Sequence, residues 1–160
     1  MGEIIKKPLY IGGQAVWKEP TIEVVYPYTR QKVGEVPLAT PEDVKKALDL
    51  AVEGQKEIAS LSAYERSQIL YRAYEILKEQ AEEFARVITL EVGKTIREAR
   101  TEVMRAQQTL LLSAEEAKRI YGETIPYDAV PNGQGKVGFY IRVPAGIVAA
   151  IKPFNFPLNL

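Results

Sequence analysis

Residues 146–160, GIVAAIKPFNFPLNL, decide the fold of this chain. The apolar run at 147–151 is short and rich in isoleucine and valine, which predicts a strand buried on both faces, as in a parallel sheet. Pro153 ends that strand, and Pro157 has the fixed backbone angle that suits the first position of a helix. Asn155 is therefore expected at the carboxyl end of a buried strand, where open α/β sheets bind their ligands.

The residues before this stretch predict a β-rich start followed by helices. Short strands rich in β-branched and aromatic residues are expected at 9–17, 22–26 and 33–38. Thr40 is expected to cap a first helix. Ser62 forms a capping box with Glu65 for a second helix, whose apolar spacing continues to residue 88. Strands, helices and a final buried strand together indicate a mixed α/β fold.

A third helix is expected from Thr95, which forms a capping box with Glu98, to about residue 120. Gly93 suits the end of the preceding helix, and Lys94 is favourable beside a helix C-terminus. The charged run at 98–105 predicts an exposed helix face with salt bridges. These signals assign structural roles to the middle of the chain.

The composition excludes several classes of function. Hydrophobic residues make up 46% of the chain and charged residues 26%, which is ordinary for a soluble domain. Lys and Arg number 21, as do Asp and Glu, so the zero net charge gives no general attraction to nucleic acid or anionic membranes. Without cysteine or histidine, no disulfide or metal site is expected. No apolar stretch approaches the ~20 residues of a membrane span, so a cytoplasmic location is expected. Ten prolines and no cysteine suit a heat-tolerant source.

Residues 133–138, GQGKVG, match the Gly-x-Gly-x-x-Gly pattern of dinucleotide-binding loops. A loop of that kind must follow a strand and open a helix. Here Pro131 and Asn132 precede the glycines, and the β-prone residues 139–141 follow them. The pattern therefore predicts a glycine-rich hairpin turn without a cofactor role.

The C-terminal stretch resembles the aldehyde dehydrogenase superfamily, whose members read Arg-x-Pro-x-Gly-Val/Ile-Val, then an apolar strand, then Pro-Trp/Phe-Asn-Phe/Tyr-Pro. The matching positions here are Arg142, Pro144, Gly146, Ile147, Val148, Pro153, Phe154, Asn155, Phe156 and Pro157. A second block is similar to the family's Glu-x-Gly-Lys...Glu-Ala...Glu-Val pattern, at Glu91, Gly93, Lys94, Glu98, Ala99, Glu102 and Val103. Phe154 stands where Trp is the more usual residue of the family. The resemblance covers essentially the whole chain in the right order.

The resemblance implies an α/β fold that is the N-terminal part of a Rossmann-type NAD(P)-binding domain, with small antiparallel β segments and an oligomerisation hairpin. Residues 1–122 are expected to hold the β start and three helices, and residues 123–143 the hairpin that joins subunits. Residues 144–160 are expected to form the first strand of the parallel cofactor sheet and the start of the next helix. The catalytic domain of the family is expected to lie beyond Leu160.

The resemblance also implies an enzyme that oxidises an aldehyde to a carboxylic acid with NAD or NADP through a cysteine thiohemiacetal. The residue that matches the family's oxyanion-stabilising asparagine is Asn155. The stretch that the family places against the cofactor is Ile151, Lys152, Pro153, Phe154 and Asn155. Because the chain has no cysteine, these 160 residues alone are expected to be inactive. A homodimer or homotetramer of the complete chain is expected.

Arg105 is the candidate substrate residue. In relatives that oxidise phosphorylated aldehydes, an arginine on the corresponding helix helps to hold the phosphate, although a surface position is the default for a mid-helix arginine. The sequence combines features that resemble the lactaldehyde, glyceraldehyde 3-phosphate and succinate semialdehyde branches of the family. It therefore does not identify which aldehyde is the substrate. An alternative function is a non-catalytic truncated assembly module of the same fold, which associates through its hairpin.

Overall fold

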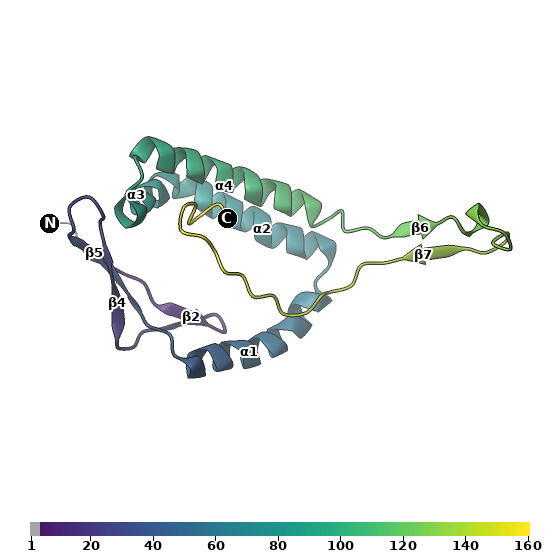
Figure 1. Cartoon of the computed structure of the whole chain (residues 1–160), viewed down its shortest axis with the longest axis horizontal. Helices are drawn as coiled ribbons and strands as arrows, with labels where there is room; N and C mark the ends of the chain where they lie inside the picture. The colour runs from purple at the N-terminus through teal and green to yellow at the C-terminus, as the bar shows by residue number, and fades with distance from the viewer. Residues whose placement is uncertain (1–3) are drawn as a thin grey trace.

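Residues 4–160, which the computed structural model describes, form small β segments, a layer of helices and a projecting hairpin (Figure 1). The N-terminal strands are β1 (Ile5–Lys6), β2 (Leu9–Ile11), β3 (Gln14–Val16), β4 (Thr21–Val25) and β5 (Lys32–Pro37). β5 pairs antiparallel with β4 and parallel with β1, whereas β2 and β3 form a separate antiparallel pair. The single strand expected at 9–17 is wrong, because a turn at Gly12 and Gly13 folds this stretch into the β2–β3 hairpin.

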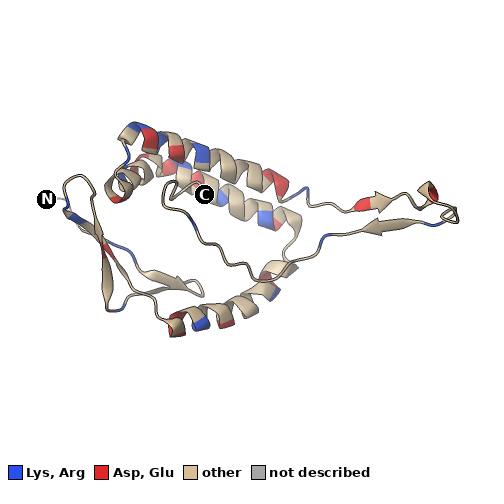
Figure 2. Ribbon diagram, in the orientation of Figure 1, with Lys and Arg blue, Asp and Glu red and all other residues tan. Residues whose placement is uncertain are grey.

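Four helices follow the strands. They are α1 (Pro41–Ser60), α2 (Ala63–Glu79), α3 (Ala81–Val92) and α4 (Ile96–Glu116). Thr40, Ser62 and Thr95 cap α1, α2 and α4, each in a capping box with an acidic residue three positions later, so these expected helix starts are confirmed. Charged residues of both signs alternate along the helices (Figure 2). Among residues 4–160, no helix is long and apolar enough to cross a membrane.

The sequence predicts three helices, whereas the structure has four among residues 4–160. The difference arises because the long helix expected from Ser62 to about residue 88 is broken at Gln80 into α2 and α3. The backbone of Gln80 has φ −102° and ψ 16°, which bends the chain between α2 and α3. The Gln80 N–H still donates to Ile76, and its carbonyl accepts from Phe84, so the backbone hydrogen bonds continue on both sides of the bend. α4 also ends at Glu116, earlier than the expected position near residue 120.

The hydrophobic core lies between α2, α3 and α4. Its buried members are Leu77, Ala85, Ile88, Ala99, Val103 and Ala106. Alanines of α3 and α4 are completely buried here, which indicates that the two helices approach closely. Leu158, from the far end of the chain, packs against the same core.

Gly93 ends α3 in the left-handed conformation, with φ 78°, as its position in the sequence predicts. We expect Gly93→Ala to lower the free energy of unfolding by about 1–2 kcal/mol, because an L-residue is strained in this conformation. Gly54→Ala is the matched control, since Gly54 lies inside α1 with open space around its Cα. That variant should gain roughly 0.5–1 kcal/mol. Urea unfolding of both variants checks the pair, and equal effects would contradict the assigned conformation.

A hairpin projects from the end of the helical layer (Figure 1). It consists of β6 (Glu123–Ile125), a single 3₁₀ turn (Tyr127–Ala129) and β7 (Gly138–Tyr140), with β6 and β7 antiparallel. A Cβ on Gly133 would lie 1.6 Å from the Tyr127 carbonyl oxygen, and one on Gly138 would lie 2.0 Å from the Tyr127 ring. The glycines of the Gly-x-Gly-x-x-Gly pattern therefore allow a tight hairpin, and no helix follows them, as expected.

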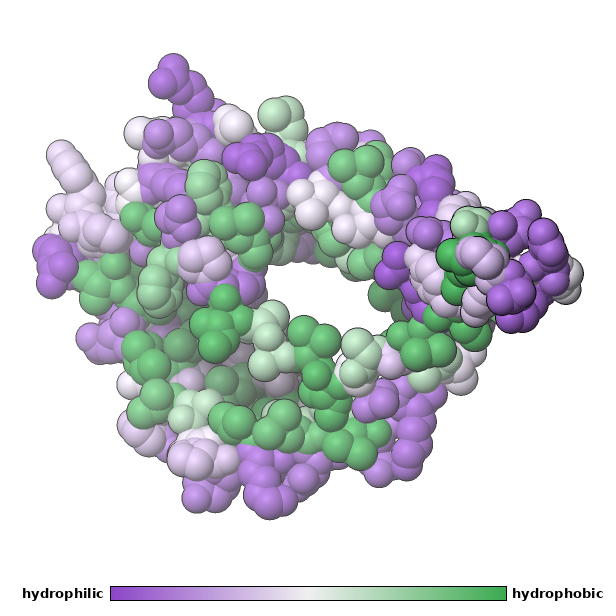
Figure 3. All heavy atoms as spheres, turned by 45° about the vertical axis from the view of Figure 1, so that its right-hand side comes forward, coloured by the Kyte–Doolittle hydropathy of each residue, from purple (hydrophilic) through white to green (hydrophobic). Residues whose placement is uncertain are grey.

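The buried parallel strand expected at 147–151 is not formed in this structure. Residues 141–153 are in no helix or strand, and Ile151 is 98% exposed. A strand buried on both faces needs paired neighbours, and no strand among residues 4–160 pairs with this run. Instead, the segment crosses from the hairpin back toward α3 and α4 (Figure 1). In a space-filling view, hydrophobic residues border an opening through the molecule (Figure 3). The helix expected from Pro157 is a single turn, closed by the Leu160 N–H on the Phe156 carbonyl.

Candidate functional site

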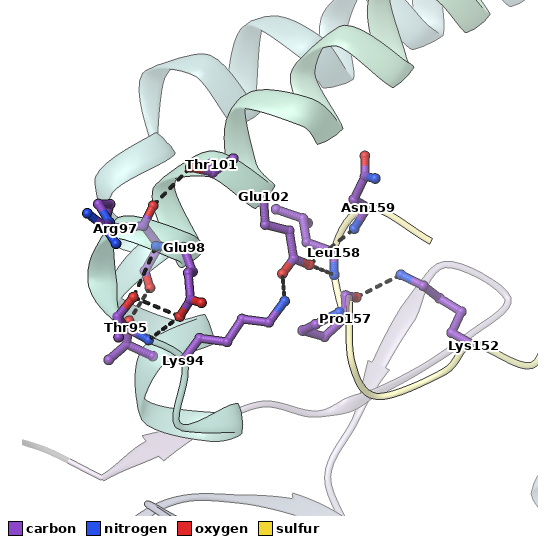
Figure 4. Close-up of polar contacts among 12 residues, drawn as sticks. Lys94, Thr95, Arg97, Glu98, Thr101, Glu102, Lys152, Pro157, Leu158 and Asn159 are labelled. Atoms are coloured by element: carbon purple, nitrogen blue, oxygen red, sulfur yellow. Dashed lines mark hydrogen bonds and ion pairs between the residues drawn. The ribbon is translucent and has the colours of Figure 1, made fainter.

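The candidate site lies where the C-terminal turn, residues 151–160, meets the first turns of α4 (Figure 4). The α4 helix is started by a capping box, in which the Glu98 N–H donates to the Thr95 hydroxyl and the Thr95 N–H donates to the Glu98 carboxylate. The Thr95 hydroxyl holds the pKa of Glu98 below its usual value. This cap fixes the helix axis and leaves Lys94 just before the helix and Glu102 within it.

Glu102 is a buried carboxylate with partners on both oxygens. Only 1% of its surface is exposed. Its Oε2 accepts from Lys94 Nζ at 2.5 Å, and its Oε1 accepts from the Leu158 N–H at 2.9 Å and the Asn159 N–H at 3.4 Å. Burial by itself raises the pKa of this carboxyl, but the Lys94 ammonium and the two amide donors outweigh burial and hold the pKa below its usual value. The Glu102 carboxylate is therefore ionised at neutral pH.

Further contacts fix the C-terminal turn against α4. Lys94 Nζ lies over the Phe156 ring at 4.0 Å from its centroid, and the Arg105 guanidinium lies over the same ring at 5.4 Å. Phe156 is half-buried. Its ring packs against these two cations and is not part of the hydrophobic core. The Thr109 hydroxyl donates to the Asn159 side chain at 3.0 Å. Together with Leu158 in the core, these contacts bind the turn along one face of α4.

The expected cofactor and oxyanion residues, 151–155, lie together on the exposed side of this turn. Asn155 is exposed, and its side chain takes part in no hydrogen bond among residues 4–160. Phe154 and Pro153 are exposed beside it. Lys152 is exposed too, and its ammonium donates to the Pro157 carbonyl at 2.8 Å, so it closes the loop rather than standing free. The carboxamide of Asn155 is thus accessible on a turn that other residues hold.

Arg105 is exposed on α4 and reaches the same turn through Phe156. The expected substrate residue therefore contacts the residue that follows the expected oxyanion residue, Asn155, in the chain. Two cavities lie elsewhere: one of about 1120 Å³ is between the N-terminal sheet and α3, and one of about 820 Å³ is between α1 and residues 142–147. Neither contains Asn155 or Arg105.

Glu102 and Lys94 are not among the residues that the motifs single out for function. The charged run at 98–105 predicts an exposed helix face, and this is wrong for Glu102, which is buried. A signal is nevertheless present in the sequence. Ala99, Glu102, Val103 and Ala106 lie at helical spacing on one face, so a carboxylate stands in the middle of the apolar stripe. A charge in that position requires a partner.

A metal centre is not supported, since no cluster of three candidate ligands exists within the described part of the chain. Ile151 and Phe154 offer apolar surface, being 98% and 90% exposed, next to the polar Asn155. Neither side chain lines one of the two large cavities.

Comparison with solved structures places the fold among dehydrogenases. Aldehyde dehydrogenase 21 from Physcomitrella patens, in complex with the reaction product succinate, matches with a TM-score of 0.93 and 37% identity over 99% of this chain and 33% of that one. The NADP-dependent glyceraldehyde-3-phosphate dehydrogenase from Bacillus halodurans C-125, complexed with NADP, matches with a TM-score of 0.90 and 30% identity over 97% of this chain and 33% of that one.

The family model described as aldehyde dehydrogenase family matches residues 16–160, and the chain belongs to that family. Among curated relatives, the 3-sulfolactaldehyde dehydrogenase of Priestia aryabhattai is 45% identical over 152 residues, which are 95% of this chain and 31% of that protein. The chain therefore spans about a third of the length of the relatives it matches.

Proposed function

We propose that this chain forms the N-terminal part of an NAD(P)-dependent aldehyde dehydrogenase and that Asn155 stabilises the oxyanion of the reaction. The observation that carries this proposal is an accessible carboxamide on a turn fixed by a buried ion pair. An oxyanion donor must be accessible to substrate and fixed before the reaction begins. The Asn155 carboxamide is accessible, and contacts of the neighbouring residues hold the backbone on both sides of it. Membership of the aldehyde dehydrogenase family supports the same function.

The chemistry follows from the charge that develops on the substrate. When a thiolate adds to an aldehyde carbon, the carbonyl oxygen becomes negative, and an N–H donor already in place stabilises it without reorganisation. A neutral carboxamide binds the negative oxygen more strongly than the neutral carbonyl of the free aldehyde, so it favours the transition state over bound substrate. The 160 residues contain no cysteine. The thiolate of the proposed reaction therefore comes from outside them.

The proposed cofactor residues are Ile151, Lys152, Pro153, Phe154 and Asn155. When bound, NAD(P)⁺ supplies the hydride acceptor for the oxidation. The exposed apolar side chains of Ile151 and Phe154 would exclude water from one face of the reacting centre. The Lys152 ammonium is engaged with the Pro157 carbonyl, so its proposed part is to keep the loop closed.

The proposal is tested on the full-length polypeptide. Purified protein is mixed with NAD or NADP and with a set of small aldehydes, and the absorbance of the reduced nicotinamide is followed. We expect turnover with at least one aldehyde, and we expect none from residues 1–160 alone. An inactive full-length protein, or turnover by the 160-residue piece, would contradict the proposal.

We further propose that the substrate is a small aldehyde with an anionic group, which Arg105 binds. Arg105 is exposed, and its guanidinium lies over the ring of Phe156. Phe156 directly follows Asn155 in the sequence. Guanidinium groups suit phosphate, sulfonate and carboxylate. The relatives include enzymes named for 3-sulfolactaldehyde and aspartate semialdehyde, both of which carry an anionic group.

Arg105→Ala is expected to lower kcat/KM for anionic aldehydes by about tenfold to a hundredfold, which corresponds to the loss of a charged hydrogen bond. Lactaldehyde, which is uncharged, should lose less than about threefold, because it makes no such bond. Steady-state kinetics with succinate semialdehyde, 3-sulfolactaldehyde and lactaldehyde check this. Arg105→Lys should keep part of the preference. An equal loss for charged and uncharged aldehydes would remove Arg105 from substrate binding.

The hairpin supports a further proposal, that full-length chains form a homo-oligomer. Val137, Phe139 and Ile141 alternate along the β7 strand and its flanks and are 91%, 70% and 67% exposed. Alternate residues of a strand share one face, so these side chains form an apolar strip on a projecting element. Light scattering of the full-length protein and of a Phe139→Lys variant tests this, and a monomeric parent protein would contradict it.

A further inference from the structure

We infer that Glu102 is a positioning residue for Asn155: its buried carboxylate holds the C-terminal turn so that the Asn155 carboxamide faces outward in a fixed place. This inference rests on the proposed function for its catalytic meaning. It begins from the hydrogen bonds in Figure 4, where one carboxylate joins Lys94 to the backbone of residues 158 and 159.

The Glu102 carboxylate accepts hydrogen bonds from free backbone N–H groups at the start of a helical turn, as a helix N-cap does, but it comes from a distant part of the chain. The Leu158 and Asn159 N–H groups follow Pro157 at the start of a helical turn, where backbone donors lack intrahelical partners. Glu102 Oε1 accepts from both. These bonds are made by an ionised acceptor in a buried position, so they are stronger than bonds between neutral groups. The turn is therefore fixed at its backbone by Glu102.

The link between this anchor and Asn155 is short and stiff. Pro157 has a fixed φ angle, and Phe156 is restricted because it precedes a proline. The Phe156 ring is also held against Lys94 and Arg105. On the other side of Asn155, the bond from Lys152 to the Pro157 carbonyl closes the loop. A displacement of Leu158 is therefore passed on to Asn155 rather than absorbed between them.

Lys94 makes a buried carboxylate compatible with an oxyanion nearby. A lone negative charge at position 102 would oppose a negative oxygen bound at Asn155. The ammonium of Lys94, in contact with Oε2, neutralises that charge, and the pair remains bound to the turn through Oε1. The pair thus holds the turn without placing an unpaired negative charge in the same region.

The first test measures the turn directly and needs no activity. Hydrogen–deuterium exchange of the full-length protein is followed in peptides that contain Leu158 and Asn159, in the parent protein and in Glu102→Ala. We expect exchange at these amides to become about tenfold faster or more, because their charged acceptor is lost. Glu75→Ala is the matched control, since Glu75 is an exposed carboxylate within α2 that takes no part in the site, and it should leave this exchange unchanged. Unchanged exchange in Glu102→Ala would overturn the inference.

The second test asks whether Glu102 acts through Asn155. In the full-length enzyme, Glu102→Ala should lower kcat by about tenfold or more with a smaller change in KM, because the oxyanion donor is displaced. In an Asn155→Ala background the same change should cost less than about twofold, since no donor remains to be positioned. Equal losses in both backgrounds would show a general structural role and would overturn the inference.

A conservative variant covers the case in which Glu102→Ala does not fold. Glu102→Gln keeps the size of the side chain and an oxygen acceptor for the Leu158 N–H but loses the charge, so exchange and kcat should lie between those of the parent and Glu102→Ala. Exchange as slow as that of the parent protein, together with a parent-like kcat, in Glu102→Gln would count against the inference. A full-length protein that oxidises no aldehyde would defeat the proposed function alone, because the exchange experiment still decides whether Glu102 holds the turn.

Discussion

Asn155→Ala in the full-length enzyme is expected to lower kcat by about 10²–10³-fold, with a much smaller change in KM. The carboxamide is exposed and has no other partner among the described residues. Its removal therefore breaks no internal contact that the structure shows. The loss instead falls on the step in which the aldehyde oxygen becomes negative, because a fixed donor interacts with that oxygen most strongly in the transition state.

Two further variants separate this role from general damage. Asn155→Asp has nearly the same size but replaces the N–H donor with a negative acceptor, so kcat should fall at least as far as in Asn155→Ala. Gln68→Ala removes an exposed carboxamide from α2, away from the site, and should keep kcat within about twofold. Steady-state kinetics and single-turnover measurements of all three variants check the prediction. Parent-like kcat in Asn155→Ala would exclude Asn155 from the reaction.

Local signals in the sequence were sufficient for the helix starts. A capping box needs only an N-cap hydroxyl and an acid three residues later, and the boxes at Ser62 and Thr95 are formed as expected. Gly93 in the left-handed conformation is local in the same sense. The break at Gln80 has no comparable local signal in the sequence, because the helical spacing of apolar residues continues unchanged from α2 into α3.

Features that depend on distant partners could not be predicted in this way. The apolar run at 147–151 has the composition of a buried strand, but a strand forms only when a neighbour pairs with it, and residues 4–160 supply none. Glu102 shows the same limit for the candidate site. Its place in an apolar stripe indicates a partnered charge, whereas its partners at 94 and 158 are known only once the chain is folded.

Lys94→Met is the second large effect that we expect, and it concerns stability. The substitution leaves the Glu102 carboxylate buried without its cation, which should lower the free energy of unfolding of the purified protein by about 3–5 kcal/mol at pH 7. Lys45→Met is the control, because the Lys45–Asp49 pair is exposed on α1 and its loss should cost less than about 1 kcal/mol. Urea unfolding measures both. A cost below that of Lys45→Met would contradict a stabilising role for the buried pair.

The pH dependence of this loss identifies its cause. In the parent protein the pKa of Glu102 is lowered by Lys94 and the turn amides, so its contribution to stability is present above the unfolded pKa of about 4.3 and is lost as the pH falls through the folded value. Without Lys94, burial dominates and the pKa of Glu102 should be raised. Protonation of the carboxyl then removes the buried charge, so the variant regains stability as the pH falls. The difference between parent and variant should therefore shrink from pH 7 to pH 4. The double variant Lys94→Met/Glu102→Gln carries no buried charge and should exceed Lys94→Met in stability at pH 7, with the gain vanishing at low pH. A difference that grows as the pH falls would mean that the carboxylate is not the group responsible.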